Sequence, residues 1–388
     1  MKLLAYIWRN VRRNKIRSGL TIMSVGFSLA LMTILFGYLT MDGIVQEQAV
    51  KLDRVVVLNK LGFASPMPIA HVKKITDFDG IKAATPYSWF GGKYKSQENV
   101  FAQFGVEPKT VFEVFHDYEI SDDQKEAFQE NRLGCVADAG LAEQMKWSIG
   151  EKIPLEGTFN AQDLDLTLVG TFKAPNNTGS LWFNWNYLDE ELKASNPNFA
   201  GNAGAIFAAC KDQNQVEVMC EEIDAGFLNS ENATQTRTEA AFLQMFSDML
   251  GDVQSYIRFI SLAVVFALVL VAGTAMAMSI RERNTEIAVL KAIGFSKTRV
   301  LGLILGESTM IAILGGVLGI AGGLGALQLI SGVPMAAQLF PIPVSALVGR
   351  PWLLGLLGVA AGIGFVSGVV PAVLAAHSSV VDGLRKVV

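Results

Sequence analysis

Cysteine and histidine are scarce in this sequence, which has three of each among 388 residues. Neither set has the spacing of metal ligands, so we expect no metal site. An odd number of cysteines cannot all pair within one chain, and the three are Cys135, Cys210 and Cys220. A disulfide between Cys210 and Cys220 is one interpretation, and reduced, buried thiols are at least as good a one.

The sequence also lacks the motifs of nucleotide-dependent and hydrolytic enzymes. It contains no G-x-x-x-x-G-K-[ST] loop, no G-x-S-x-G elbow and no H-E-x-x-H pair. We therefore expect no catalytic residue, no cofactor of its own and no enzyme activity. If the protein uses the energy of a nucleotide, a separate chain must supply it.

Charge is absent from four long stretches of the chain, at 18–41, 259–280, 308–349 and 351–381. A helix that crosses the hydrocarbon core of a bilayer needs about 20 apolar residues, so each stretch can contain one. Buried helices of a large soluble enzyme are the alternative, but four such stretches are hard to explain in water. The sequence predicts transmembrane helices at 18–41, 256–280, 300–330 and 352–376.

Positive charges predict the orientation of these helices, because Lys and Arg concentrate in short cytoplasmic segments. Six lie in residues 1–17 without any acid, five lie in 281–299, and the loop at 331–351 has only Arg350. We therefore expect a cytoplasmic amphipathic helix at 1–17, a cytoplasmic segment at 281–299 and a cytoplasmic tail at 377–388. Residues 42–255 would lie outside, with 17 basic and 32 acidic residues, a net charge of 17 − 32 = −15.

The predicted outer segment alternates between strand-like and helical patterns without a strict repeat. Strands are expected at 54–59, 81–90, 99–106, 164–172 and 203–210, and helices at 68–78, 137–147 and 215–227. This mixture is typical of an α+β domain. The stretch "GSLWFNWN" at 179–186 would form a strand whose aromatic side chains pack the domain's own core, or else a surface for an apolar ligand.

Two features inside the predicted membrane helices call for a role. Gly315, Gly319 and Gly323 recur every four residues, a spacing that lets two helices approach closely, within one subunit or across a dimer. Glu307 is the single acidic residue within a predicted span. It would be a proton or cation site, or a structural, hydrogen-bonded group near the cytoplasmic interface, and we favour the structural role.

The segment "RERNTEIAVLKAIGFSKTRV" at 281–300 reads as an amphipathic helix between two membrane spans. Its apolar side would consist of Ile287, Leu290 and Ile293, and Gly294 would end it in a cap or sharp turn. We expect Glu286 to pair with Arg283 or with the neighbourhood of Arg281, and Lys291 to stay free. Such a helix either docks on a soluble protein or lies in the lipid interface, and the pattern alone does not decide.

This segment resembles the cytoplasmic segment of the FtsX-like permease family, and in particular its MacB-type ABC transporter permeases. The residues that carry the resemblance are Glu282, Arg283, Glu286, Ile287, Leu290, Ala292, Ile293 and Gly294. The opening "AYIWRNVRRNKIRSGLTIMSVGFSLA", the span "ESTMIAILGGVLGIAGG" and the outer "LGCVADAGLAEQMKWSIGEKIPL" are also similar to that family. The tail departs from it, because Val373 and Leu374 stand where relatives commonly carry basic residues.

The resemblance implies a fold of four transmembrane helices plus a large α+β extracytoplasmic domain, the MacB-like periplasmic core domain. The chain would be one permease of a homodimer in the bacterial inner membrane, and a cytoplasmic ABC ATPase dimer would bind ATP and magnesium. Residues 281–299 would be the coupling helix, with the ATPase contacts Arg281, Glu282, Arg283, Glu286, Ile287, Leu290, Lys291 and Gly294.

In this family, ATP hydrolysis is expected to move the outer domain and so to export or extract a lipid, a lipoprotein or a small amphiphile. A periplasmic adaptor and an outer-membrane channel are further expected partners, and nucleic acid is not. The alternative is an FtsX-like signalling scaffold that activates a periplasmic cell-wall hydrolase. A proton-coupled carrier built on Glu307 is a more distant third hypothesis.

Overall fold

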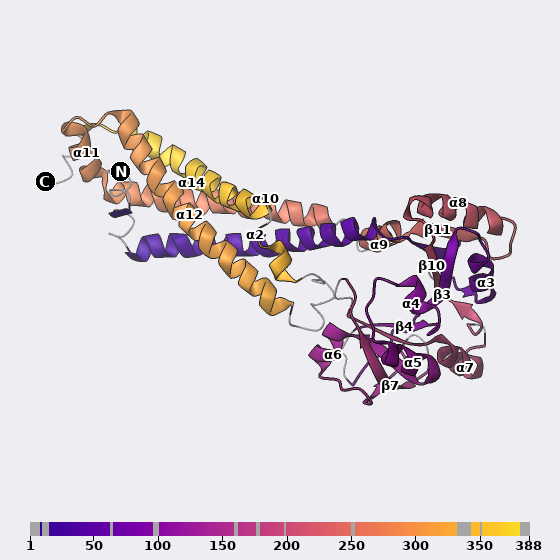
Figure 1. Cartoon of the computed structure of the whole chain (residues 1–388). Coiled ribbons are helices and arrows are strands. Elements are labelled where there is room, and N and C mark those ends of the chain that lie inside the picture. Colours follow the sequence, from indigo (N-terminus) through magenta and orange to yellow (C-terminus); the bar gives the residue numbers. More distant parts are fainter. Residues whose placement is uncertain are drawn as a thin grey trace. The chain divides into compact units, whose positions relative to one another are not determined.

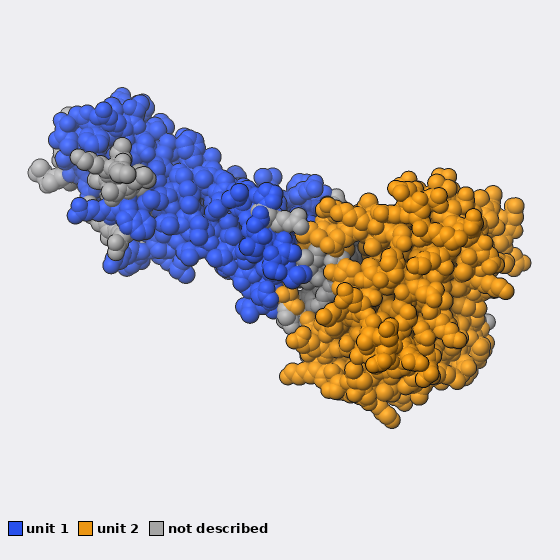
Figure 2. All heavy atoms as spheres, in the orientation of Figure 1, with its two compact units in different colours: residues 1–40, 252–329, 343–388 blue, residues 41–251, 330–342 orange. Residues whose placement is uncertain are grey.

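The structure is a computed structural model that describes residues 8–9, 15–62, 65–95, 101–158, 162–175, 179–197, 199–249, 253–331, 343–349 and 351–380. It divides into two compact units, coloured separately in Figure 2. Unit 1 comprises residues 1–40, 252–329 and 343–388, and unit 2 comprises residues 41–251 and 330–342. Most of the helix predicted at 1–17, of the loop at 331–351 and of the tail at 377–388 lies outside the described residues.

Unit 1 contains long apolar helices, which run alongside one another in Figure 1. They are α2 (Lys15–Ala49), α10 (Val253–Glu282), α12 (Lys297–Ile330) and α14 (Pro351–His377), and α2 continues into unit 2. Among the described residues these four are long and apolar enough to cross a membrane. Each of the predicted spans lies within one of them, so the membrane part of the fold prediction is confirmed.

Close approach of α2 and α12 explains the glycine spacing on α12. A Cβ atom at Gly319 would lie 2.5 Å from the carbonyl oxygen of Gly26, and one at Gly323 would lie 2.5 Å from the Cβ of Thr33. At Gly315 a Cβ would lie 2.8 Å from the Cβ of Val25. The three glycines therefore serve packing within one subunit rather than between two.

Helix α14 packs against α12 and α10 through small residues as well. A Cβ at Gly364 would lie 2.7 Å from the Cα of Thr309, and one at Gly368 would meet the Ser308 side chain. Gly358 and Gly362 have nothing within 4 Å of an added Cβ among the described residues. Among the described residues, Gly364 and Gly368 are therefore the glycines of α14 that lie against another helix.

Unit 2 is built on a mixed sheet of nine strands, in the order β11-β1-β10-β3-β4-β8-β5-β7-β6. β4 pairs with β8 and β5 with β7 in parallel, and the other pairings are antiparallel. The strands are β1 (Arg54–Asn59), β3 (Ile81–Trp89), β4 (Ala102–Val106), β5 (Gly134–Asp138), β6 (Lys152–Leu155), β7 (Leu164–Phe172), β8 (Ser180–Asn184), β10 (Ala205–Cys210) and β11 (Thr234–Thr238). A separate pair joins β2 (Met67–Pro68) and β9 (Asn202–Ala203).

Helices cover both faces of this sheet, which is why β1 is apolar at successive positions rather than at alternate ones. Val55 and Val57 belong to a core under α3 (Ala70–Thr76) and α8 (Val216–Phe227). Val56 and Leu58 face the opposite core, which includes α4 (Val111–Val114), α5 (Asp122–Glu130) and α9 (Glu239–Met249). A strand buried on both faces reads as a continuous apolar run.

A third core lies on strands β5, β6, β7 and β8, under α6 (Ala139–Met145) and α7 (Trp185–Ser195). The aromatic stretch at 179–186 belongs to the interior, since Trp182, Phe183 and Trp185 are all buried. The prediction of a core role for these side chains is therefore confirmed, as is the α+β class. The three cysteines are free thiols, so no disulfide joins Cys210 to Cys220.

Candidate functional site

The segment between α10 and α12 forms a shorter helix than the sequence predicted. α10 runs through Glu282, Arg283 breaks the helical geometry, and α11 spans Asn284–Ala292. Gly294 follows with a φ of +98°, a left-handed conformation that side chains other than glycine rarely adopt. The predicted sharp turn is present, and it returns the chain into α12 at Lys297.

Arg283 joins α11 to α12. Its Nη1 donates to both carboxylate oxygens of Glu307, at 3.2 and 2.9 Å, and its Nε donates to Glu286 at 3.2 Å. Burial alone would lower the pKa of Arg283, but the charge of Glu307 and the hydrogen bonds raise it above the usual arginine value. Glu307 is only 8% exposed, and its contacts are those of a structural ion pair. The pairing of Glu286 with Arg283 is as predicted.

Lys291 joins α11 to the end of α14, and the prediction that it stays free is wrong. Its Nζ donates to the carbonyl oxygen of Ala375 at 2.7 Å and to the carbonyl oxygen of Ser378 at 2.9 Å. The last carbonyls of a helix lack partners within it, and a lysine that reaches them caps the helix and complements its dipole. Burial, together with the charge of Lys297, lowers the pKa of Lys291.

The apolar side of α11 is divided between the interior and the surface. Ile287 is buried against Val300 and Ile304 of α12 and Ala375 of α14. Ile293 is 69% exposed and Val289 is 46% exposed. Of the predicted apolar side, Ile287 therefore packs within the chain, whereas Ile293 follows the end of α11 and lies at the surface. Arg281 and Glu282 are exposed, and Leu290 is half-buried.

A cavity of about 260 Å³ lies beside this ion pair, between α2, α10, α12 and α14. Its charged lining residues are Glu282, Arg283, Glu286 and Glu307, and its small or apolar ones include Ala275 and Ala312. No group of side chains suited to hold a metal ion occurs among the described residues. The charged contacts at this cavity position α11 against α12.

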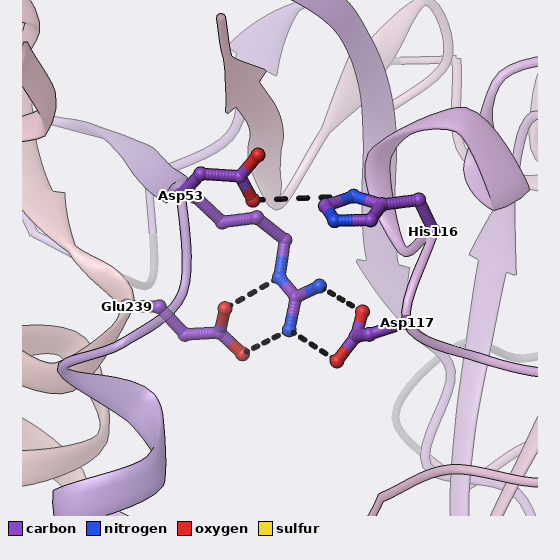
Figure 3. A network of polar contacts seen from close by, with 5 residues as sticks. Asp53, His116, Asp117 and Glu239 are labelled. Carbon is purple, nitrogen blue, oxygen red and sulfur yellow. Dashed lines mark hydrogen bonds and ion pairs between the residues drawn. The ribbon is translucent and has the colours of Figure 1, made fainter. Parts of the chain in front are cut away.

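A second polar network, in unit 2, was not found from the sequence (Figure 3). Arg54 at the start of β1 lies between the carboxylates of Asp117 and Glu239, and it is only 1% exposed. Burial would lower the pKa of Arg54, but the two carboxylates raise it above its usual value, while burial raises the pKa of Glu239. In sequence these residues are far apart and carry no common motif.

Two family models match this chain. The model of the MacB-like periplasmic core domain matches residues 18–225, which is more than half of the chain. The model of the FtsX-like permease C-terminal region matches residues 258–380, which include α11, Glu307 and the end of α14.

Curated proteins of similar sequence carry permease names. An uncharacterized ABC transporter permease of Methanocaldococcus jannaschii is 23% identical over 402 residues, covering 99% of this chain and 97% of the relative. The uncharacterized ABC transporter permease YvrN of Bacillus subtilis is 27% identical over 194 residues, covering 50% of this chain and 43% of YvrN.

Solved structures with a similarity to part of the chain include two outer domains. One is the periplasmic region of MacB from Actinobacillus actinomycetemcomitans, with 11% identity, a TM-score of 0.37 and coverage of 52% of this chain and 95% of that one. The other is the extracellular domain of the ABC-type transporter YknZ from Gram-positive bacteria. It has 12% identity, a TM-score of 0.35 and coverage of 47% of this chain and 99% of that one.

Proposed function

Since the chain belongs to the family of FtsX-like permeases with a MacB-like periplasmic core domain, we propose that it couples ATP hydrolysis in a partner to movement of that domain. As an ABC transporter permease it is a multi-pass inner-membrane protein and a non-enzymatic transporter subunit. Family membership implies a separate ATPase subunit. The finer features of coupling, substrate and assembly are proposals.

The observation that carries the coupling proposal is the double attachment of α11. One end is tied to α12 through Arg283 and Glu307, and the other to the end of α14 through Lys291. A force on α11 therefore reaches two membrane helices through charged contacts as well as through the packing of Ile287. The exposed Val289 and Ile293 supply apolar surface for a cytoplasmic partner.

The orientation follows from charge. We place α11 and both termini in the cytoplasm, because basic residues dominate 1–17 and 281–299, and we place unit 2 on the outer side. The substrate class that we propose is a lipid, a lipoprotein or a small amphiphile on the outer side of the membrane. A second copy of the chain, a periplasmic adaptor and an outer-membrane channel complete the proposed assembly.

The two alternative functions have less support. An FtsX-like scaffold that activates a cell-wall hydrolase would use the same membrane region, but the match to the MacB-like core domain over 18–225 favours the transporter. A proton carrier based on Glu307 would need a carboxylate that can release its ion-pair partner. Glu307 instead accepts two hydrogen bonds from Arg283.

The proposal is tested by purifying the tagged chain from its own host in mild detergent and identifying the co-purifying proteins. We expect the wild-type chain to retain an ATPase with a P-loop. Ile293→Asp should lose it, because a charge replaces exposed apolar surface on the side of the membrane where the ATPase docks. Leu228→Asp, which changes an exposed apolar residue of unit 2, is the matched control and should retain it. A wild-type chain without an ATPase, or an Ile293→Asp variant that keeps it, contradicts the proposal.

Hydrolysis by the purified complex provides a second measurement. Glu307→Gln should leave a complex that still hydrolyses ATP, since the amide keeps an acceptor for Arg283. Glu286→Ala combined with Gly294→Pro should uncouple hydrolysis from the permease, because proline cannot adopt the φ of +98° that ends α11. Hydrolysis that is unaffected by the double variant would remove α11 from the coupling mechanism.

A further inference from the structure

The first strand after α2 and the last strand before α10 lie side by side in unit 2. Four residues separate the end of α2 at Ala49 from the start of β1 at Arg54. On the other connection, β11 ends at Thr238, α9 begins at Glu239, and α10 follows from Val253. β1 and β11 are paired antiparallel, with Val55 opposite Thr238. The strand that follows α2 and the last strand before α10 are therefore neighbours in the same sheet.

The buried guanidinium of Arg54, on β1, joins the start of α9 to the segment that follows α4. Arg54 Nε donates to Glu239 Oε2 at 2.6 Å, and Nη2 lies 3.5 Å from Glu239 Oε1. On its other side Nη1 donates to Asp117 Oδ1, and Nη2 donates to Asp117 Oδ2 at 3.3 Å. In Figure 3 the two carboxylates face the guanidinium from opposite sides. This two-sided arrangement fixes the angle between the three segments as well as their distance.

The network also reaches the aromatic interior of unit 2. The guanidinium carbon of Arg54 lies 4.7 Å from the centre of the Phe115 ring, and Phe115 lies 5.1 Å from the Trp182 ring of β8. Asp117 lies three residues after the end of α4 and two residues after Phe115. A displacement of β1 or α9 is therefore passed both to the chain after α4 and to the centre of the sheet.

We propose that Arg54, Asp117 and Glu239 form a junction through which movements of α2 and α10 reach the outer domain together. The proposal rests on the proposed function, and it assigns these three residues a positioning role. Stability alone does not require such a group, because apolar residues of similar volume often replace a buried ion pair without loss. Its directional hydrogen bonds instead hold the angle between the two connecting segments.

The test compares hydrogen exchange in the permease–ATPase complex with and without ATP. The test variant is Arg54→Met, Asp117→Asn and Glu239→Gln together, which removes all three charges and leaves no buried charge without a partner. The control is Arg132→Met, which breaks the half-exposed pair of Arg132 with Glu190 in the same domain. Thermal unfolding and the rate of ATP hydrolysis are measured in parallel.

In the wild type and in Arg132→Met, ATP should change the exchange rates of amides in β1, β11 and α4. The measured quantity is the ratio of each exchange rate with ATP to the rate without ATP. In the triple variant the change in this ratio should be about 2- to 30-fold smaller than in the wild type, as for residues that carry coupling between sites. Its hydrolysis rate should stay close to that of the wild type. If the triple variant does not fold, Glu239→Gln alone, which keeps one oxygen acceptor, should give a smaller reduction of the same change.

A triple variant with the wild-type ratio, or an Arg132→Met variant with an equal reduction, overturns the role of Arg54. The same holds if Glu239→Gln leaves the ratio unchanged. A wild-type complex that hydrolyses ATP without any change of exchange in unit 2 overturns the proposed function and this inference together.

Discussion

Arg283 shows how one residue can hold a buried charge through hydrogen bonds that the opposite charge strengthens. Glu307 lies inside a helix that is otherwise free of charge from Val300 to Ile330, where an uncompensated carboxylate is costly. The guanidinium of Arg283 forms an ion pair with this carboxylate, and its Nη1 donates a hydrogen bond of 2.9 Å to Glu307 Oε2. The carboxylate is thereby paired with a cation and fixed in position.

Removing one partner of this pair should cost more than removing both. Arg283→Met leaves Glu307 without its cation, and we expect a loss of about 3 kcal/mol, the lower end of the range for broken buried pairs, because Arg283 is partly exposed. Arg283→Met combined with Glu307→Gln should recover most of this loss. Thermal unfolding of the detergent-solubilised protein measures both. A double variant that is less stable than Arg283→Met would contradict the ion-pair interpretation.

At the scale of elements, α12 is the central helix of unit 1. One side of it approaches α2 through Gly315, Gly319 and Gly323, and another meets α14 at Gly364 and Gly368. Packing this close replaces lipid contacts with backbone contacts, which is the main source of helix association in a membrane. Glycines that lie away from these contacts, such as Gly322, do not have this role.

Gly319 and Gly322 provide a matched pair of substitutions on the same helix. Gly319→Ala places a Cβ atom 2.5 Å from the backbone oxygen of Gly26, whereas a Cβ at Gly322 meets nothing within 4 Å. We expect Gly319→Ala to destabilise the protein by about 1–3 kcal/mol, as overpacked cores do. Gly322→Ala should be neutral or should stabilise by up to about 1 kcal/mol through helix propensity. Equal thermal stability of the two variants would show that α2 and α12 do not pack this closely.

At the scale of the whole molecule, the proposed orientation places α11 and unit 2 on opposite sides of the membrane. Single cysteines at Ile293 and Leu61 test this, because the two side chains are 69% and 86% exposed. In intact cells a membrane-impermeant thiol reagent should label Leu61→Cys and not Ile293→Cys, and both should be labelled after lysis. Labelling of Ile293→Cys from outside would reverse the topology.

The native cysteines should contribute little background to that measurement. Cys135 and Cys210 are buried, and Cys220 is half-buried. Burial raises the pKa of Cys210 to about 12 and that of Cys220 to about 11. Since the thiolate is the reactive form, these thiols react slowly near neutral pH. The unsubstituted protein is the control for their labelling.

Much of the architecture could be predicted from local sequence patterns. The strands predicted at 54–59 and 164–172 match β1 and β7 residue for residue. Helices α3, α6 and α8 lie within the predicted ranges, with differences of up to two residues at their ends. The site was predicted less well. The contacts of Lys291 depend on the position of α14, and the exposure of Ile293 depends on where α11 ends. Neither is a local property of residues 281–299.

By itself the sequence determined that this chain has four membrane-spanning segments, a mixed α/β domain between the first two, and a glycine turn after an amphipathic helix. These follow from the cost of placing charge in hydrocarbon and from apolar periodicity, which act over about 20 neighbouring residues. Only the tertiary structure decided which helices the glycines face and which charges meet. Glu307 pairs with an arginine 24 residues away and Arg54 with a glutamate 185 residues away, since such partners are selected by long-range packing rather than by local composition.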